Sequence, residues 1–170
     1  LSEEQFATVV AATRQAGAAW IFGTAYGRLV DGKPEHYNAA ILVGPGGQVE
    51  ERYHKQRLVI FGEFIPFENI LPFMKWLSPC PYEYTVRCGE TVNSIPWKNY
   101  RLGTLICYED SAHDLCREFM LKVNPSFWMN ISNDGWFGYG TQQAQHLVNC
   151  AFRAVENRVG VARSVNTGIS

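Results

Sequence analysis

The chain has 170 residues, of which 46% are hydrophobic and 18% are charged, and its formal net charge at neutral pH is −1. This balance is typical of one globular domain with a substantial core, and it excludes a disordered or fibrous chain. The near-neutral charge argues against nucleic acid as a partner. No apolar run approaches the length of about 18 residues that a membrane span needs.

The first part of the chain predicts one helix followed by three strands. Ser2 and Gln5 have the spacing of a capping box at a helix start, and Gly17 is a typical residue to end that helix. Two strands are predicted from apolar runs at 18–26 and 37–43, and a third, more exposed strand at 48–53. The turn-forming segments 30–34 and 44–47 separate them.

The long segment 54–97 is predicted to be mostly irregular, with a short helix near 69–77. A connection of this length inside a compact domain is usually functional. After it, strands and helices alternate: strands at 101–106, 126–131 and 159–165, helices at 111–123 and 141–158. This alternation predicts a layered α/β fold, with residues 1–170 in a single domain.

Cys107 is the strongest candidate for chemistry. It follows the apolar strand 101–106 directly and precedes Glu109, Asp110 and a predicted helix. A strand that ends in a sharp turn into a helix presents a side chain to solvent, and a helix start favours a thiolate. The alternative is a small buried cysteine at a strand end.

Three other polar groups are candidates to assist Cys107. Lys55 can hold a developing oxyanion as a compact point charge, although a solvated strand end explains it equally well. Glu63 lies between two phenylalanines and must be paired if it is buried. His54 is the obvious histidine partner for a cysteine, but no third group completes such a set.

The cysteine and histidine spacing does not predict a metal site. The five cysteines include no CxxC pair, and the four histidines form no HxxxH pair. Cys80 and Cys88 could close a small disulfide loop in an oxidising compartment. Whether they are bridged stays open, because their separation in sequence says nothing about the geometry that a disulfide needs. No metal or organic cofactor is implied.

Seven short blocks, in chain order, resemble the nitrilase, or carbon–nitrogen hydrolase, superfamily. Within it they are most similar to the catalytic domains of bacterial apolipoprotein N-acyltransferases. The blocks are YHKQRLV (53–59), FGEFIP (61–66), ICYED (106–110), NISNDGWFG (130–138), QHL (145–147), RAVENR (153–158) and RSVNTGIS (163–170). Soluble nitrilases share the lysine and cysteine blocks in looser form, so FGEFIP and SNDGWFG point to the acyltransferases. The resemblance implies an α-β-β-α sandwich.

The resemblance also implies residue roles. Cys107 would be the nucleophile, Lys55 would stabilise the tetrahedral oxyanion, and Glu63 would be a second essential carboxylate near that lysine. Tyr108 and Glu109 match positions that support the nucleophile. The reaction would move a fatty acyl chain from a phospholipid, through a cysteine thioester, to the N-terminal amine of a diacylglyceryl-cysteine lipoprotein. Its place would be the bacterial inner membrane, with the catalytic domain facing the periplasm or the outside.

The chain departs from this pattern at its ends. The family's general base is a glutamate in a Trp-Pro-Glu block, and Glu3 and Glu4 do not match it because they belong to a helix start. The later strands and the transmembrane helices of the family have no match either. We therefore expect an internal piece of a longer protein, a sandwich incomplete at both ends that reaches the membrane through other parts of the parent chain. Alone it would be inactive, because nothing deprotonates Cys107.

An apolar segment bears on the substrate. Residues 60–77 carry few charges and many large apolar side chains, and a second aromatic pair follows Gly135. Part of this surface must pack on the core, and the surplus can face acyl chains or the membrane interface. A loop that only covers the core is the alternative. The possible lipid-facing residues are Phe64, Phe67, Phe73, Trp76, Trp136 and Phe137.

Three functions follow from these observations. The favoured one is the membrane N-acyltransferase. The second is a soluble amidase of the nitrilase family, in which water resolves the acyl-enzyme on a small amide or nitrile. The third is a non-catalytic nitrilase-like scaffold, which would tolerate replacement of Cys107.

Overall fold

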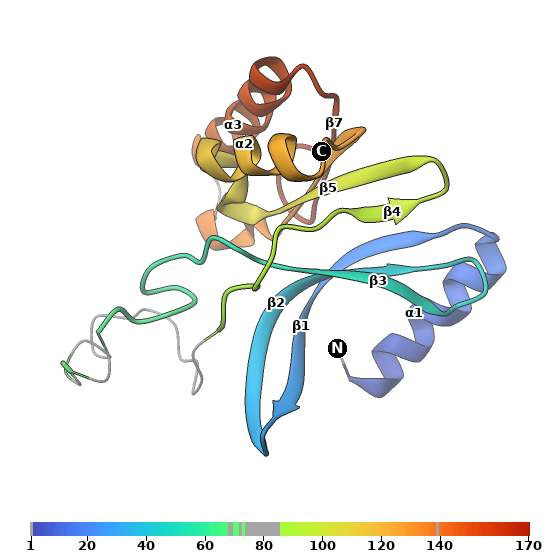
Figure 1. The fold of residues 1–170 in the computed structure, drawn as a ribbon. Coiled ribbons are helices and arrows are strands. Elements are labelled where there is room, and N and C mark those ends of the chain that lie inside the picture. The colour runs from blue at the N-terminus through green and yellow to red at the C-terminus, as the bar shows by residue number, and fades with distance from the viewer. Residues whose placement is uncertain (1, 68–69, 72, 74–85, 139) are drawn as a thin grey trace.

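The computed structural model describes residues 2–67, 70–71, 73, 86–138 and 140–170. These residues form two sheets, with helix α1 (Glu3–Ala16) outside the first and helices α2 (His113–Lys122) and α3 (Gln142–Asn157) outside the second (Figure 1). The layers follow the order α-β-β-α. The predicted α/β sandwich is confirmed.

Helix α1 begins and ends where the sequence predicts. The Ser2 hydroxyl accepts a hydrogen bond from the Gln5 amide, and the Gln5 side chain accepts one from the Ser2 amide, which completes the capping box. Gly17 ends the helix in the left-handed conformation, at φ 58°. A glycine adopts this conformation at little cost because it has no Cβ.

The first sheet is an antiparallel meander of β1 (Trp20–Val30), β2 (Lys33–Val43) and β3 (Val49–His54). Trp20 pairs with Val43 at one end of the β1–β2 ladder, and Val30 pairs with Lys33 at the other. Asp31 and Gly32 form the two-residue turn between them, both with positive φ, as hairpin turns of this length require. The strands are therefore longer than the apolar runs predicted, because the hairpin ladder continues past the last apolar residue.

The second sheet contains β4 (Ile95–Trp97), β5 (Tyr100–Ile106), β6 (Phe127–Ser132) and β7 (Val161–Val165), in that order. Strand β4 was not predicted; it is a three-residue strand that forms only because it pairs with β5. Strands β5, β6 and β7 are parallel, with α2 and α3 as the crossovers. Their carboxyl ends therefore meet at one edge of the sheet.

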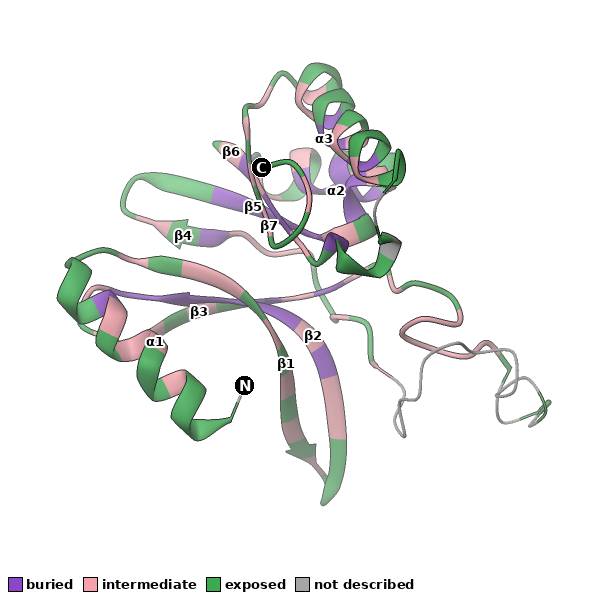
Figure 2. Cartoon of the chain, turned by 180° about the vertical axis from the view of Figure 1, so that it is seen from behind, coloured by how far each residue is buried: buried purple, intermediate pink, exposed green. Residues whose placement is uncertain are grey.

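The core lies between the two sheets and beneath α2 (Figure 2). Strand β2 contacts β5, and β1 contacts β6 so closely that a Cβ added at Gly23 would lie 3.3 Å from the Ile131 side chain. Phe119 of α2 packs edge-on against Trp128, with ring centroids 5.5 Å apart. Burial of these apolar faces is the main contribution that holds the layers together.

Several sequence predictions fall on the loop after β3. The helix predicted near 69–77 lies largely outside the described residues, as does Cys80. Cys88 is a free thiol in this structure. None of the helices in the described ranges is long and apolar enough to cross a membrane.

Candidate active site

The predicted site residues gather where β3 and β5 end. Lys55 is the first residue after β3, and Cys107 is the first residue after β5. The two strands belong to different sheets, so it is the packing of one sheet on the other that brings their ends together. The lysine and cysteine blocks, which are far apart in sequence, meet there through the hydrogen bonds of Glu109.

Cys107 occupies a strained turn. Its φ is +54°, in the left-handed region that residues with a Cβ rarely adopt. It opens a short 3-10 helix, η2 (Cys107–Ser111), and helix α2 begins only at His113. The prediction of an α-helix starting at 111 is thus wrong at its beginning. The turn itself presents the partly exposed side chain.

Lys55 and Glu63 form a buried pair. The Lys55 ammonium is 1% exposed and donates to both Glu63 carboxylate oxygens, at 2.9 and 2.8 Å. Glu63 also accepts from the Asn38 side chain and the Val59 amide, both at 2.8 Å. Among the described residues Glu63 is the only hydrogen-bond partner of the ammonium, which leaves one of its three N–H groups for a further acceptor.

Glu109 joins the cysteine turn to the lysine segment. It is fully buried and accepts four hydrogen bonds. One oxygen accepts from the Tyr53 hydroxyl and from the Gln56 and Arg57 amides, at 3.0, 2.6 and 3.0 Å. The other accepts from the Ile106 amide at 2.8 Å. The single Glu109 carboxylate thus connects the residues that follow Lys55 to the residue before Cys107.

The Glu109 carboxyl should make stability depend on pH. Burial raises the pKa of Glu109 from 4.5 to about 7, although its backbone donors favour the charged form. Between these two values the folded state holds a proton that the unfolded state has lost, so stability falls as pH rises through this window. We expect the free energy of unfolding to decline from about pH 5 to about pH 8 in the wild type, and this decline to be smaller in Glu109→Gln. Urea denaturation of both proteins at the two pH values measures it; equal pH dependence would contradict the assignment.

The remaining predicted residues lie at the surface. The Tyr108 side chain is 55% exposed, unlike its neighbour Glu109. Phe67, Phe73 and Trp136 are exposed, and Phe64 is half-buried and lines a cavity of about 390 Å³ together with Leu58, Val86 and Cys88. Trp76 and the Phe137 side chain lie outside what the structure describes.

His54 faces away from the cysteine turn. Neighbouring residues of a strand point to opposite faces, and Tyr53 is the one that reaches Glu109. The His54 ring is stacked on Tyr37 and Tyr26, with centroid distances of 4.4 and 5.4 Å. Burial lowers the pKa of His54, and Arg28 and Arg52 lower it further. A Cys107–His54 pair is therefore not formed.

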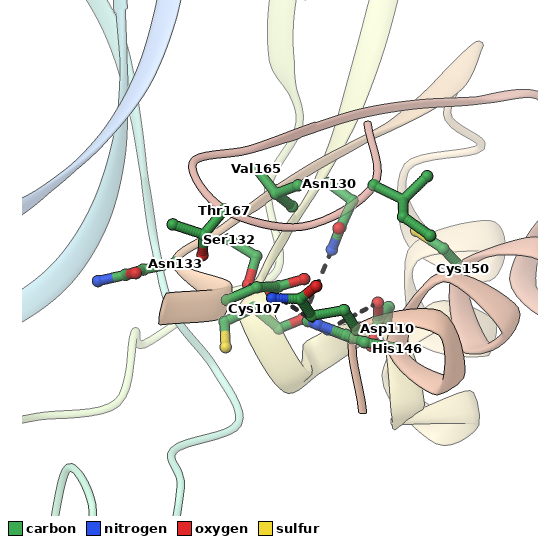
Figure 3. Close-up of polar contacts among 12 residues, drawn as sticks. Cys107, Asp110, Asn130, Ser132, Asn133, His146, Cys150, Val165 and Thr167 are labelled. Carbon is green, nitrogen blue, oxygen red and sulfur yellow. Dashed lines mark hydrogen bonds and ion pairs between the residues drawn. The ribbon is translucent and has the colours of Figure 1, made fainter. Parts of the chain in front are cut away.

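A second polar cluster, which the sequence did not predict, lies behind the cysteine turn (Figure 3). Asp110 and Asp134 are fully buried, and His146 and Arg163 are nearly so. His146 contacts both carboxylates, and Arg163 pairs with both. All four belong to the blocks quoted above, but their positions on four different elements gave no sign that they meet. In the described portion of the chain, no group of three or more potential metal ligands was found.

The chain is similar in sequence to a known protein family and to curated members of it. A family model described as carbon–nitrogen hydrolase matches residues 1–170. The chain is 36% identical over 136 residues to an apolipoprotein N-acyltransferase of Geobacter metallireducens, covering 80% of this chain and 26% of that protein. It is 34% identical over 137 residues to apolipoprotein N-acyltransferase 1 of Treponema denticola, covering 78% and 25%. The chain thus spans about a quarter of the length of these relatives.

Solved structures share the fold at lower identity. A carbon–nitrogen hydrolase from Helicobacter pylori G27 superposes with a TM-score of 0.67 and 17% identity, over 99% of this chain and 52% of that one. An amidase from Nesterenkonia sp. gives a TM-score of 0.62 and 16% identity, over 96% and 52%. At such identity the likeness establishes the fold alone.

Proposed function

The chain belongs to the carbon–nitrogen hydrolase family, and from this membership we propose that residues 1–170 are part of the catalytic domain of a lipoprotein N-acyltransferase. The relatives above, at 34–36% identity, carry that name. The observation that carries the proposal is the buried Lys55–Glu63 pair. Glu109 connects this pair to the cysteine turn, because its carboxylate accepts from the amides of Gln56 and Ile106. The exposed aromatic side chains of Phe67 and Phe73, on the loop that follows Glu63, favour a lipid donor over a small amide.

The chemistry assigned to these residues is acyl transfer in two steps. The Cys107 thiolate attacks the ester carbonyl of a phospholipid, the C–O bond breaks, and the lysophospholipid leaves with a proton. The N-terminal amine of a diacylglyceryl-cysteine lipoprotein then attacks the thioester, loses a proton, and releases the thiol. In both steps the free N–H of Lys55 stabilises the tetrahedral oxyanion, while Glu63 keeps the ammonium charged and oriented. Tyr108 and Glu109 support the turn.

The general base is the one role that we assign to no residue of this chain. Glu63 and Glu109 are both engaged by several donors, so neither is placed to take the thiol proton. We propose that a carboxylate in the longer protein supplies it. We further propose that the longer protein anchors the domain at the bacterial inner membrane, facing the periplasm or the outside.

The exposed aromatic residues should contribute to lipid contact. Phe67 is 67% exposed and Phe73 is 54% exposed on the same loop, and each apolar side chain that enters a lipid interface stabilises binding. We expect the double substitution of Phe67 and Phe73 by Ser to weaken binding to phospholipid vesicles about tenfold. Leu121→Ser is the matched control, because Leu121 is 76% exposed on α2, away from this loop. Vesicle sedimentation measures both; equal binding of all proteins would contradict lipid contact.

The proposed function is tested with the complete reading frame that encodes residues 1–170. Membranes that contain it are incubated with a diacylated lipoprotein substrate and phospholipid, and mass spectrometry of the lipoprotein N-terminus measures the added acyl chain. An increase by one fatty acyl group supports the transferase. Release of ammonia from small amides, with no acylated lipoprotein, would identify a soluble-type amidase instead. If the protein shows neither the acyl transfer nor the amide hydrolysis, that result would indicate a non-catalytic scaffold.

A further inference from the structure

The buried cluster behind the cysteine turn is costly to form and has no part in the chemistry above. Four ionisable side chains meet there, from η2, from the 3-10 helix η3 (Asp134–Phe137), from α3 and from β7. Charges are removed from water only at a large free-energy cost unless they are paired and hydrogen-bonded. The position of this cluster relative to Cys107 indicates what it does.

His146 is at the centre of the cluster. Its Nδ1 lies 2.9 Å from an Asp134 oxygen, and its Nε2 lies 3.0 Å from an Asp110 oxygen. Both ring nitrogens face carboxylates, which accept but do not donate, so both carry a proton and the ring is an imidazolium. Burial by itself lowers the pKa of His146, but the hydrogen bond and the charge of Asp110 outweigh it and raise the pKa.

Arg163 completes the charge balance. Its guanidinium pairs with Asp134 at 2.8 Å and with Asp110 at 3.3 Å. Arg163 Nη2, which donates to Asp134 at 2.8 Å, also lies 3.1 Å from His146 Nδ1. The shorter of these two contacts of Nη2 is the one to the Asp134 carboxylate. Two carboxylates thus face two cations, and the cluster as a whole is neutral.

The cluster contacts Cys107 at its backbone carbonyl oxygen. The Cys107 carbonyl oxygen accepts from His146 Nε2 at 3.2 Å and from the Asn130 side chain at 3.5 Å. Asn130 is itself held by Arg163 and bonds the Leu105 carbonyl at 3.2 Å. The Cys107 sulfur points away from the cluster (Figure 3). The contacts therefore act on the conformation of residue 107 and leave the thiol unobstructed.

We propose that His146 is a positioning residue, which holds the Cys107 carbonyl through its Nε2–H and thereby keeps the nucleophile in its left-handed turn. A residue with a Cβ stays at φ +54° only where its surroundings impose it. Without this hydrogen bond to the carbonyl, residue 107 relaxes to another backbone conformation. Its sulfur then moves away from its position near the Lys55 segment, to which Glu109 connects the turn. The inference rests on the proposed function only in taking Cys107 as the nucleophile.

Two substitutions of His146 separate its two ring nitrogens. The amide nitrogen of Gln lies near the position of His Nε2, so His146→Gln retains the donor that Asp110 and the Cys107 carbonyl share. The amide nitrogen of Asn lies near that of Nδ1, so His146→Asn retains only the donor to Asp134. Both replacements are neutral and polar, and both remove the cation from the cluster, which makes them matched controls for each other. His113→Asn, at the exposed start of α2, controls for a surface histidine.

The readout is alkylation of the cysteines by iodoacetamide, followed by peptide mapping in the same sample. Cys88 is exposed and serves as the internal reference. Cys116 and Cys150 are buried, and burial raises the pKa of Cys116 to about 12 and that of Cys150 to about 11, so they report loss of structure. The assay needs no acyl donor and no general base, so its result is independent of whether the protein transfers acyl groups.

We expect the ratio of Cys107 to Cys88 alkylation to fall about tenfold in His146→Asn and to stay within about twofold of wild type in His146→Gln. Cys116 and Cys150 stay protected in both. Equal ratios in the Asn and Gln variants would overturn the proposal, whether both fall or neither changes. It would also be overturned if Cys107 changes only together with exposure of Cys116 and Cys150, because that result describes a general structural role.

Discussion

Replacement of Cys107 by Ala should abolish acyl transfer by the complete protein, with a fall of more than about a thousandfold in rate. The thiol forms the covalent intermediate, and none of the other three cysteines that the structure describes is placed to substitute for it. Among the described cysteines, Cys116 and Cys150 are buried and Cys88 lies on the loop beyond Glu63. The side chain of residue 107 is only partly buried, at the margin of the core, so removal of its single sulfur atom should leave the fold intact.

Two measurements check this expectation. Mass spectrometry of the wild-type protein incubated with phospholipid should detect a fatty acyl chain on the peptide that contains Cys107, in a form that hydroxylamine removes. The adduct should be absent in Cys107→Ala and present in Cys88→Ser, while all three proteins melt at similar temperatures. An adduct that persists without Cys107, or lipoprotein acylation by the Ala variant, would exclude Cys107 as the nucleophile.

Replacement of Glu63 by Gln should lower both stability and activity. Four hydrogen bonds converge on the two Glu63 oxygens, two from Lys55 and one each from Asn38 and Val59. The Gln side chain has one oxygen in place of two. Its NH2 group would face two of the four donors and could not accept their hydrogen bonds. The Lys55 ammonium, 1% exposed, then loses its counter-charge. Breaking a buried pair from one side costs about 3 kcal/mol or more of the free energy of unfolding.

Activity should fall with the same substitution by about a hundredfold, because a misplaced ammonium no longer stabilises the oxyanion. The matched control is Glu118→Gln, which breaks the exposed pair of Glu118 with Lys122 one turn along α2. That change should cost less than about 0.5 kcal/mol and leave activity unchanged. Urea denaturation and the lipoprotein assay measure the two effects. If Glu63→Gln behaves like Glu118→Gln, the Lys55–Glu63 pair has neither role.

Local sequence was sufficient to predict the elements whose determinants lie within a few residues. The capping box of Ser2 and Gln5 and the left-handed Gly17 set the ends of α1, since both act over one helical turn. The apolar runs predicted most strands because burial on both faces requires continuous apolar residues. Strand β4 escaped prediction because three residues have no periodicity, and it exists only through its pairing with β5.

The same distinction applies to the candidate site. Residue type and position made Cys107, Lys55 and Glu63 candidates but left structural alternatives open for each. The family resemblance implied that Glu63 lies near Lys55, and the structure shows the two side chains paired. His54, adjacent to Lys55 in sequence, proved to face the other way because strand residues alternate.

The sequence by itself determined the order of elements, the layered α/β class and the identity of the three candidate catalytic residues. Tertiary structure alone decided the left-handed conformation of Cys107, the four donors on Glu109, and the meeting of His146 with Asp110, Asp134 and Arg163. The physical reason is the sequence distance over which each interaction acts. Caps and apolar runs act between near neighbours, whereas a buried charge cluster is assembled from elements that meet only when the parallel strands have paired.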